Sequence, residues 1–219
     1  MKKVQKHDAG FTLLEIIVVL AVLGALAAML SPVVFRYIDD ANRTRAQADT
    51  TATAAAINQM YGNTGRYPFY ASGTGALAYS ATTDAELLTS NTACSGAPAA
   101  ITCDTTVPAA GSATGWGTLS GTGASKGASL TSHLIQNTPA YATTGPRRWR
   151  GPYLAAIPTL DPWGRSYISN ISKADPNDAT PEAVWVLSAG ANGIIETNGD
   201  TLTTANPSVG GDDVGARVK

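Results

Sequence analysis

A single carboxylate, Glu15, lies in an otherwise uncharged apolar run between Phe11 and Phe35. A lone carboxylate in lipid costs several kcal/mol unless it is paired, so such groups are rare in apolar segments and usually functional. Near the N-terminus of a helix, the macrodipole would also favour an acid at this position. We therefore expect a functional role for Glu15. The alternative is a carboxylate that reaches the membrane interface or stays protonated.

The other reactive side chains do not form a catalytic pattern. His7 lies before the apolar run, so a Ser-His-Asp triad would depend on His133 alone. The sequence has no closely spaced histidine pair for zinc. Asp212 and Asp213 are adjacent, which suits metal ligation better than opposed acid and base roles. We predict that the chain is not an enzyme, with a membrane-anchored hydrolase as the rival class.

Two cysteines, Cys94 and Cys103, lie in a stretch rich in Gly, Ala and Thr. If the body of the protein lies outside the cytoplasm, we expect them to form a small-loop disulfide. Two free thiols are the alternative. The spacing does not fit a CxxC redox or zinc motif.

The chain has a low net charge, and three lysines are clustered before the apolar run. A net charge of -1, with 14% charged residues, gives no basic footprint for nucleic acid. Lys2, Lys3 and Lys6 precede the apolar run and a polar body follows it. This asymmetry places residues 1–10 in the cytoplasm and the body across the membrane.

The apolar run has the length of a membrane span. As a helix, residues 11–35 would extend roughly 37 Å, longer than a hydrocarbon core of about 30 Å. The run is too long for the apolar region of a secretory signal, although Ala25-Leu26-Ala27 leaves an ordinary cleaved signal peptide as an alternative. Gly24 and Pro32 interrupt the run, and Pro32 predicts a kink or a place where the helix can locally open.

Apolar periodicity continues beyond the membrane, so residues 36–65 are predicted to form the outer half of the same helix. We expect it to end at about Tyr61, with the stop signal in residues 62–65. A stripe of mostly small residues at three- and four-residue steps is predicted to pack on the body. Its members are Val34, Ile38, Ala41, Ala48, Ala52 and Ala55.

Residues 66–219 are predicted to form a globular head, giving an α+β fold. Residues 166–171 and 183–188 are expected to form two strands of a small antiparallel sheet. Residues 71–145 form a long, weakly charged loop insert. Within it, a capping box at 83–86 followed by Leu87-Leu88 predicts a short helix, and residues 129–136 predict another.

The stretch Gly10-Phe11-Thr12-Leu13-Leu14-Glu15 resembles the class III leader junction of type IV pilins and pseudopilins. The resemblance implies that residues 1–10 are a leader, which a prepilin peptidase cuts between Gly10 and Phe11. It also implies methylation of the new amine on Phe11 and an assembly role for Glu15, with Gly24 and Pro32 part of the same segment. The freed amine is then the nearest cation for Glu15.

The body resembles the major pseudopilin of the type II secretion system at three places. Residues 65–68 (GRYP) match its turn after the long helix, and residues 148–154 (RWRGPYL) and 157–167 (IPTLDPWGRSY) match later motifs. The resemblance implies a type IV pilin-like fold. Pro162 and Gly164 suit a tight turn. Trp149, Tyr153 and Trp163 are expected to pack in the core.

The C-terminal loop, residues 188–213, resembles the calcium-binding turns of the same family. The resemblance implies calcium ligands at the Ala189 carbonyl, Asn192, Asp212 and Asp213. Asn192 replaces an acid and residues 197–209 lengthen the loop, so Glu196 or Asp200 are candidates to compensate. Calcium favours such flexible oxygen cages. Ordinary polar turns are the alternative.

Together these features predict a subunit that polymerises into a helical pseudopilus of a type II secretion system. The expected location is the bacterial inner membrane, by a single span, with a periplasmic head. The implied partners are copies of the chain, prepilin peptidase, an inner-membrane assembly platform and minor pseudopilins. A major or minor type IV pilin of a surface pilus is the alternative.

Overall fold

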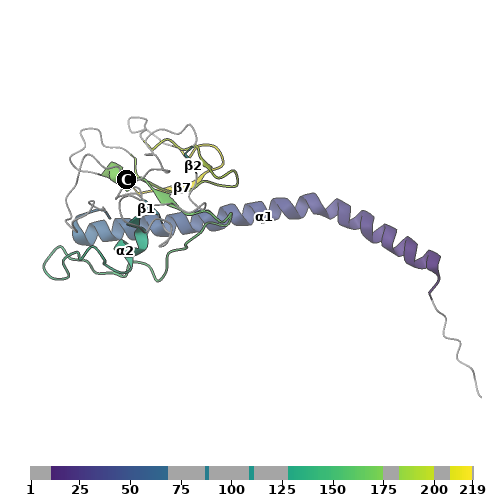
Figure 1. The fold of residues 1–219 in the computed structure, drawn as a ribbon, viewed down its shortest axis with the longest axis horizontal. Helices are drawn as coiled ribbons and strands as arrows, with labels where there is room; N and C mark the ends of the chain where they lie inside the picture. The colour runs from purple at the N-terminus through teal and green to yellow at the C-terminus, as the bar shows by residue number, and fades with distance from the viewer. Residues whose placement is uncertain are drawn as a thin grey trace, which may run out of the picture. The chain divides into compact units, whose positions relative to one another are not determined.

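The computed structural model describes residues 11–68, 87–88, 109–110, 128–174, 183–199 and 208–218. Contacts divide the chain into two units, Met1–Ala41 and Asn42–Lys219. The helix α1 (Leu13–Thr64) contributes to both units (Figure 1). The predicted leader, the capping box at 83–86 and the cysteine pair Cys94 and Cys103 lie outside the described residues.

Both ends of α1 carry clear capping signals. At its start, the Glu15 N–H donates to Thr12 Oγ1 at 3.2 Å, so Thr12 is the N-cap. At its end, Gly65 adopts φ 72° and its N–H donates to the Tyr61 carbonyl at 2.7 Å. The predicted end at about Tyr61 is therefore too early, because Gly62 stays helical and Gly65 provides the left-handed residue.

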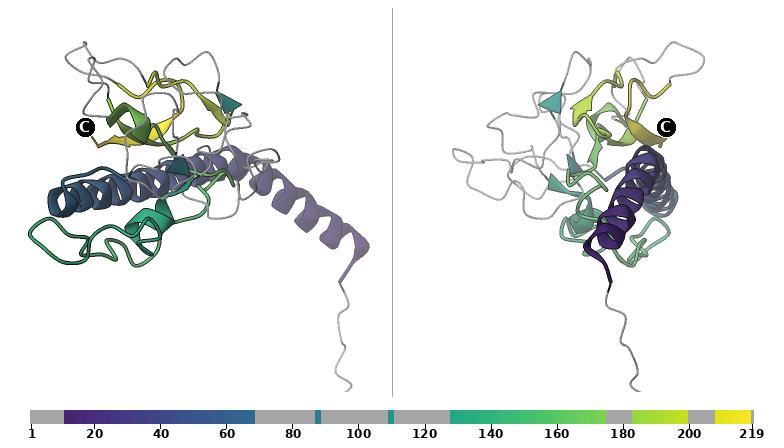
Figure 2. Two further views of the ribbon diagram at one scale, coloured as in Figure 1. Left: turned by 60° about the vertical axis from the view of Figure 1, so that its left-hand side comes forward. Right: turned by 90° about the vertical axis from the view of Figure 1, so that its right-hand side faces the viewer.

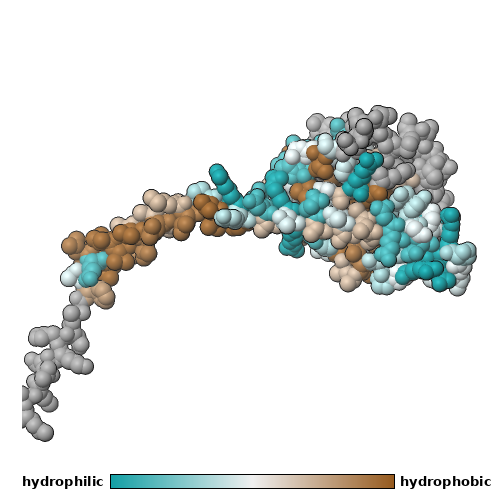
Figure 3. Space-filling view, turned by 180° about the vertical axis from the view of Figure 1, so that it is seen from behind, coloured by the Kyte–Doolittle hydropathy of each residue, from teal (hydrophilic) through white to brown (hydrophobic). Residues whose placement is uncertain are grey.

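In the first unit, α1 presents its apolar side chains outward. From Leu13 to Phe35 the large apolar side chains are between 46% and 78% exposed. They form the brown surface of this helix segment in Figure 3. Among the described residues, α1 is the one helix long and apolar enough to cross a membrane.

The second unit is built on a five-stranded sheet with the strand order β3-β1-β4-β5-β7. These strands are β1 (Leu87–Leu88), β3 (Ala128–Ser129), β4 (Ile168–Ser169), β5 (Trp185–Ser188) and β7 (Val214–Arg217). Strands β4, β5 and β7 pair antiparallel, and β1 pairs antiparallel with β4 and parallel with β3. The predicted pairing of residues 166–171 with 183–188 is confirmed as β4 and β5.

Smaller elements complete this unit. A second pair joins β2 (Ala109–Ala110) to β6 (Ile194–Ile195). The short helix α2 (Leu130–Leu134) confirms the prediction at 129–136. A 3-10 turn, η1 (Ile171–Ala174), follows β4.

The short helix predicted from the capping box at 83–86 is wrong at Leu87 and Leu88. Both residues form β1, where Leu87 is opposite Ser169 and Leu88 is opposite Ile168. Pairing with a buried central strand overrides the local capping signal, since short-range propensity is a weak prior.

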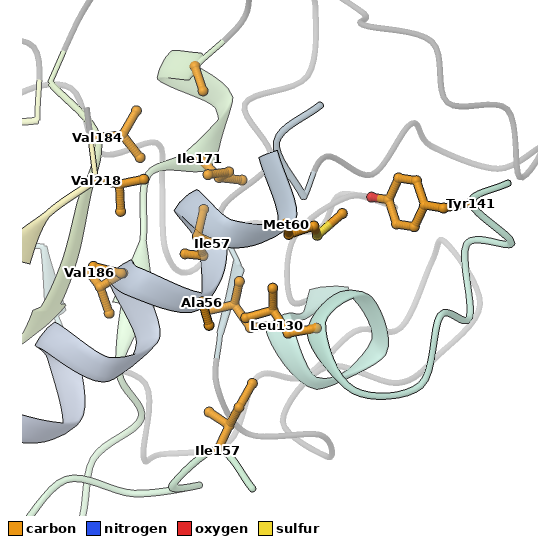
Figure 4. Packing of buried hydrophobic residues seen from close by; sticks show 13 residues of the cluster. Ala56, Ile57, Met60, Leu130, Tyr141, Ile157, Ile171, Val184, Val186 and Val218 are labelled. Carbon is orange, nitrogen blue, oxygen red and sulfur yellow. The ribbon is translucent and has the colours of Figure 1, made fainter. Parts of the chain in front are cut away.

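The core lies between the sheet and the second half of α1. Ile57 and Met60 are fully buried and share one cluster with Val184, Val186 and Val218 (Figure 4). Strand β7 lies beside α1 (Figure 2), where Gln47 Nε2 donates to the Gly215 carbonyl at 3.2 Å. The two predicted tryptophans and the tyrosine also pack against core clusters, as expected: Trp149, Tyr153 and Trp163.

The predicted packing stripe on α1 is wrong. All of its members are exposed, and Ala48, Ala52 and Ala55 line an open groove with Val209 and Val214. The buried face consists instead of Ala46, Thr50, Thr53, Ala54, Ala56, Ile57, Met60 and Thr64.

The error has a physical cause in the threonines. The hydroxyls of Thr50, Thr53 and Thr64 donate to the carbonyls four residues earlier, at 2.9, 2.9 and 2.8 Å. This bond satisfies the hydroxyl inside its own helix, so a threonine can be buried at little cost. A reading based on hydropathy counts these positions as polar and shifts the predicted face.

Candidate functional site

The start of α1 places Glu15 in the first helical turn. Thr12 is the N-cap and Glu15 is the third helical residue, which gives the T-x-x-E spacing of a capping box. The N-terminal location favours a carboxylate through the helix dipole. Phe11, two residues before the helix, is 79% exposed. Among the described residues, no Lys or Arg forms an ion pair with Glu15.

Gly24 and Pro32 both lie inside α1, whose helical assignment continues through them. A Cβ added at Gly24 would meet no described atom within 4 Å. The packing of this one chain therefore does not require a glycine there. The predicted kink or opening at Pro32 remains a prediction.

The second candidate is the C-terminal carboxylate loop, which we define as residues 188–197 and 210–213. Residues 188–197 and 210–213 approach each other closely at two glycines, Gly190 and Gly211. Gly190 has φ 59°, and a Cβ there would collide with the backbone carbonyl of Asp212. Gly211 has φ 53°, and a Cβ there would collide with the carboxylate of Glu196. Both glycines are thus needed for conformation and for close approach.

Asp213 is the most buried carboxylate of this loop, with 7% of its surface exposed. Its Oδ2 accepts hydrogen bonds from the N–H groups of Glu196 and Thr197, at 2.9 and 2.7 Å. It also accepts from Thr197 Oγ1 at 2.6 Å. Burial raises the pKa of Asp213, and the three donors oppose that change.

The loop also contains oxygens that are buried without a partner. Asp212 Oδ2 accepts from the Asn192 N–H at 3.0 Å. The Oδ1 atoms of both Asp212 and Asp213 are buried and have no hydrogen-bond partner among the described residues. A buried carboxylate oxygen without a donor is costly. A bound cation would remove that cost.

Glu196 joins the same cluster, as one of the two predicted compensating acids. Its Oε2 accepts from Asn192 Nδ2 and from the Asp212 N–H, both at 3.1 Å. Asn192 Oδ1 accepts from the Ile194 N–H at 2.6 Å, and the Ala189 carbonyl from the Gly193 N–H at 3.1 Å. The other compensating candidate, Asp200, lies outside the described residues.

The oxygens of the carboxylate loop fit calcium, a hard cation that also takes backbone carbonyls as ligands. They fit less well a metal that needs side-chain ligands alone. Among the described residues, no three His, Cys, Asp or Glu side chains converge closely enough to hold a metal ion by themselves. Calcium draws six to eight oxygens from carboxylates, amides and backbone carbonyls together. The carboxylate loop offers all three kinds, including the two buried Oδ1 atoms.

His133, the residue on which a catalytic triad would depend, lies in the core. It is fully buried in α2, and its Nδ1 lies 2.6 Å from the Tyr141 hydroxyl. Burial lowers the pKa of His133 to about 3. The side chain is therefore a neutral packing and hydrogen-bonding group near neutral pH.

Sequence reasoning missed three polar residues that support the carboxylate loop: Asp161, Ser188 and Thr197. Ser188 Oγ donates to Asp161 Oδ2 at 2.6 Å, and Thr197 holds Asp213 as described above. The DPWG turn gave a usable signal for Asp161, because an Asp before such a turn commonly accepts the following N–H groups. No comparable local signal marks Ser188 or Thr197.

Comparison with known proteins bears on the N-terminal segment and on the family of the chain. A prokaryotic N-terminal methylation motif matches residues 5–31. The chain is 34% identical over 82 residues to type II secretion system core protein G of Dickeya chrysanthemi, which covers 37% of this chain and 54% of that protein. The same protein from Pseudomonas aeruginosa is 41% identical over 64 residues, or 29% of this chain and 45% of the relative.

A pilin is also similar over a shorter share of its length. The toxin coregulated pilin of Vibrio cholerae is 36% identical over 69 residues, which covers 29% of this chain and 31% of the pilin. The chain spans about half the length of the two core G proteins that it matches. No solved structure matches.

These findings agree with the fold, in which a long apolar N-terminal helix continues into a head built on a small sheet. The chain thus has a type IV pilin-like α+β fold, carries the N-terminal methylation motif and is homologous, over part of its length, to the major pseudopilin of the type II secretion system.

Proposed function

We propose that this protein is a structural subunit that polymerises through α1 into the pseudopilus of a type II secretion system, and is not an enzyme. The observation that carries the proposal is the apolar first half of α1, exposed along its whole length, with Glu15 in its first turn. A surface of this kind is stable in lipid or against other copies, and a contact that repeats without closing gives a filament.

The proposed assembly step pairs two charges from different copies. Cleavage between Gly10 and Phe11 frees an amine, which is methylated and stays cationic. Glu15 of a neighbouring copy then neutralises this amine as the subunit leaves the membrane. Gly24, where this chain has open space in place of a side chain, would allow a second helix to approach closely.

The location and the partners follow from this role. Before assembly, the subunit lies in the bacterial inner membrane with its head in the periplasm. Prepilin peptidase processes it, and an inner-membrane platform with minor pseudopilins and a cytoplasmic ATPase assembles it. The filament would help push folded proteins through the outer membrane.

Two measurements test the proposal. Intact mass of the chain from its native membrane should correspond to residues 11–219 plus one methyl group, and an uncut chain would exclude the junction. Glu15→Gln should be cut as the natural chain is but form no filaments, because the amine loses its counter-charge. Glu15→Asp, which keeps the charge, should retain part of the assembly. Normal filaments from Glu15→Gln would refute the charge pairing.

A surface type IV pilus is the second candidate, favoured by the similarity to the toxin coregulated pilin. Gene neighbours separate the two candidates. A secretin with minor pseudopilins supports the secretion role, and a retraction ATPase supports the pilus.

We further propose that the carboxylate loop binds calcium through Asp212, Asp213, Asn192, the Ala189 carbonyl and Glu196. The two buried Oδ1 atoms without partners support this proposal. When bound, the ion would supply positive charge that links residues 188–197 to residues 210–213. Its role would be to order the C-terminal part of the head.

A further inference from the structure

The DPWG turn, residues 161–164, is closed by one buried carboxylate. Asp161 is 5% exposed, and its Oδ1 accepts from the N–H groups of Trp163 and Arg165 at 3.0 and 2.8 Å. The Gly164 N–H donates to the Asp161 carbonyl at 3.0 Å, and Gly164 has φ 85°. These contacts use Oδ1 and the backbone, so Oδ2 is available for a contact outside the turn.

That contact reaches the carboxylate loop. Asp161 Oδ2 accepts from Ser188 Oγ at 2.6 Å, and the same Oγ accepts from the Gly190 N–H at 3.2 Å. Because the hydroxyl has a single proton, its donation to Asp161 directs its lone pairs toward Gly190. Gly190 in turn lies against the backbone and side chain of Asp212. A continuous series of contacts therefore runs from Asp161 to Asp212.

The same turn touches the loop at a second point. The guanidinium of Arg165 lies over Gly193, where an added Cβ would collide with it. Gly193 has φ 74°, and its N–H donates to the Ala189 carbonyl at 3.1 Å. The turn at 161–165 thus supports both ends of the segment from Ser188 to Gly193.

We propose that Asp161 is a positioning residue for cation binding, acting through Ser188 to hold Gly190 and the Ala189 carbonyl in place against Asp212. The inference rests on the calcium binding proposed above. Asp161 itself touches no cation. It fixes the backbone that presents the oxygens, as hydrogen-bonded outer groups commonly do around metal sites.

The test is calcium titration by calorimetry on the processed full chain in detergent. Asp161→Asn and Ser188→Ala should each weaken calcium binding by about 10-fold or more. The double variant should bind no more weakly than the worse single variant, because both act through one connection. Tyr167→Phe is the matched control, since it removes a buried hydroxyl whose 2.8 Å bond runs to Asp49 on α1. It should lower stability and leave calcium affinity unchanged.

The possible outcomes separate the calcium proposal from the positioning role of Asp161. If the natural chain binds no calcium, the calcium proposal and this inference both fail. If it binds calcium and the Asp161 and Ser188 variants bind equally well, only the positioning role is overturned. If Tyr167→Phe weakens binding as much as they do, the effect is general destabilisation and the positioning role is again overturned.

Discussion

Two adjacent alanines give a sharp test of how α1 packs in the head. Ala54 is 4% exposed and belongs to the main core cluster, whereas Ala55 is exposed at the open groove. Replacing either alanine with leucine adds the same three carbon atoms, and the change in helix propensity is the same at both positions. At Ala54 the new atoms must fit into a packed core, which typically costs about 1–3 kcal/mol.

The expected difference in stability between the two variants is measurable as a difference in melting temperature. In a domain of this size, about 1 kcal/mol corresponds to roughly 2–4 °C, so Ala54→Leu should lower the midpoint by about 2–12 °C. Ala55→Leu should stay within about 0.5 kcal/mol of the natural chain. Tryptophan fluorescence during thermal unfolding of the full chain in detergent reports both values. A larger loss from Ala55→Leu would refute the observed helix face and restore the stripe predicted from hydropathy.

Three further predictions concern the head. Between pH 3 and 6.5 the unfolded chain protonates His133 and the folded chain does not. The free energy of unfolding should therefore fall as the pH falls through this window, by up to about 1.4 kcal/mol per pH unit. His133→Gln should flatten this dependence in urea unfolding at several pH values, and an unchanged slope would contradict the assignment. Tyr167→Phe removes the bond to Asp49 and should cost about 1–3 kcal/mol of stability in the same assay, whereas no loss would show that the bond contributes nothing. Chelating calcium should lower the melting temperature of the natural chain, and an unchanged melt would indicate ordinary polar turns.

Much of the architecture could be predicted because it depends on strong local signals. The apolar run from Phe11, the antiparallel pair at β4 and β5 and the turn at Gly164 were all readable from composition, alternation and turn residues. Leu87 and Leu88 were misassigned because their strand exists only through pairing with residues far along the chain.

The candidate site was predictable to a lesser degree. Asp212, Asp213 and Glu196 could be named in advance because their residue types suit cation binding. The supporting bonds of Asp161 and Ser188 join positions 27 residues apart, so they depend on the folded sheet and leave no periodic signal. The buried face of α1 was missed for a different reason, since threonine satisfies its hydroxyl within the helix.

The central claim is that Glu15 of one copy neutralises the N-terminal amine of another within a filament. A cryo-EM reconstruction of filaments assembled from the natural chain tests it most directly. The account predicts chains that begin at Phe11, bundled through the apolar half of α1, with the Phe11 amine within ion-pair distance of a neighbouring Glu15. Filaments in which Glu15 faces solvent, or in which the apolar half of α1 lies outside the bundle, would contradict it.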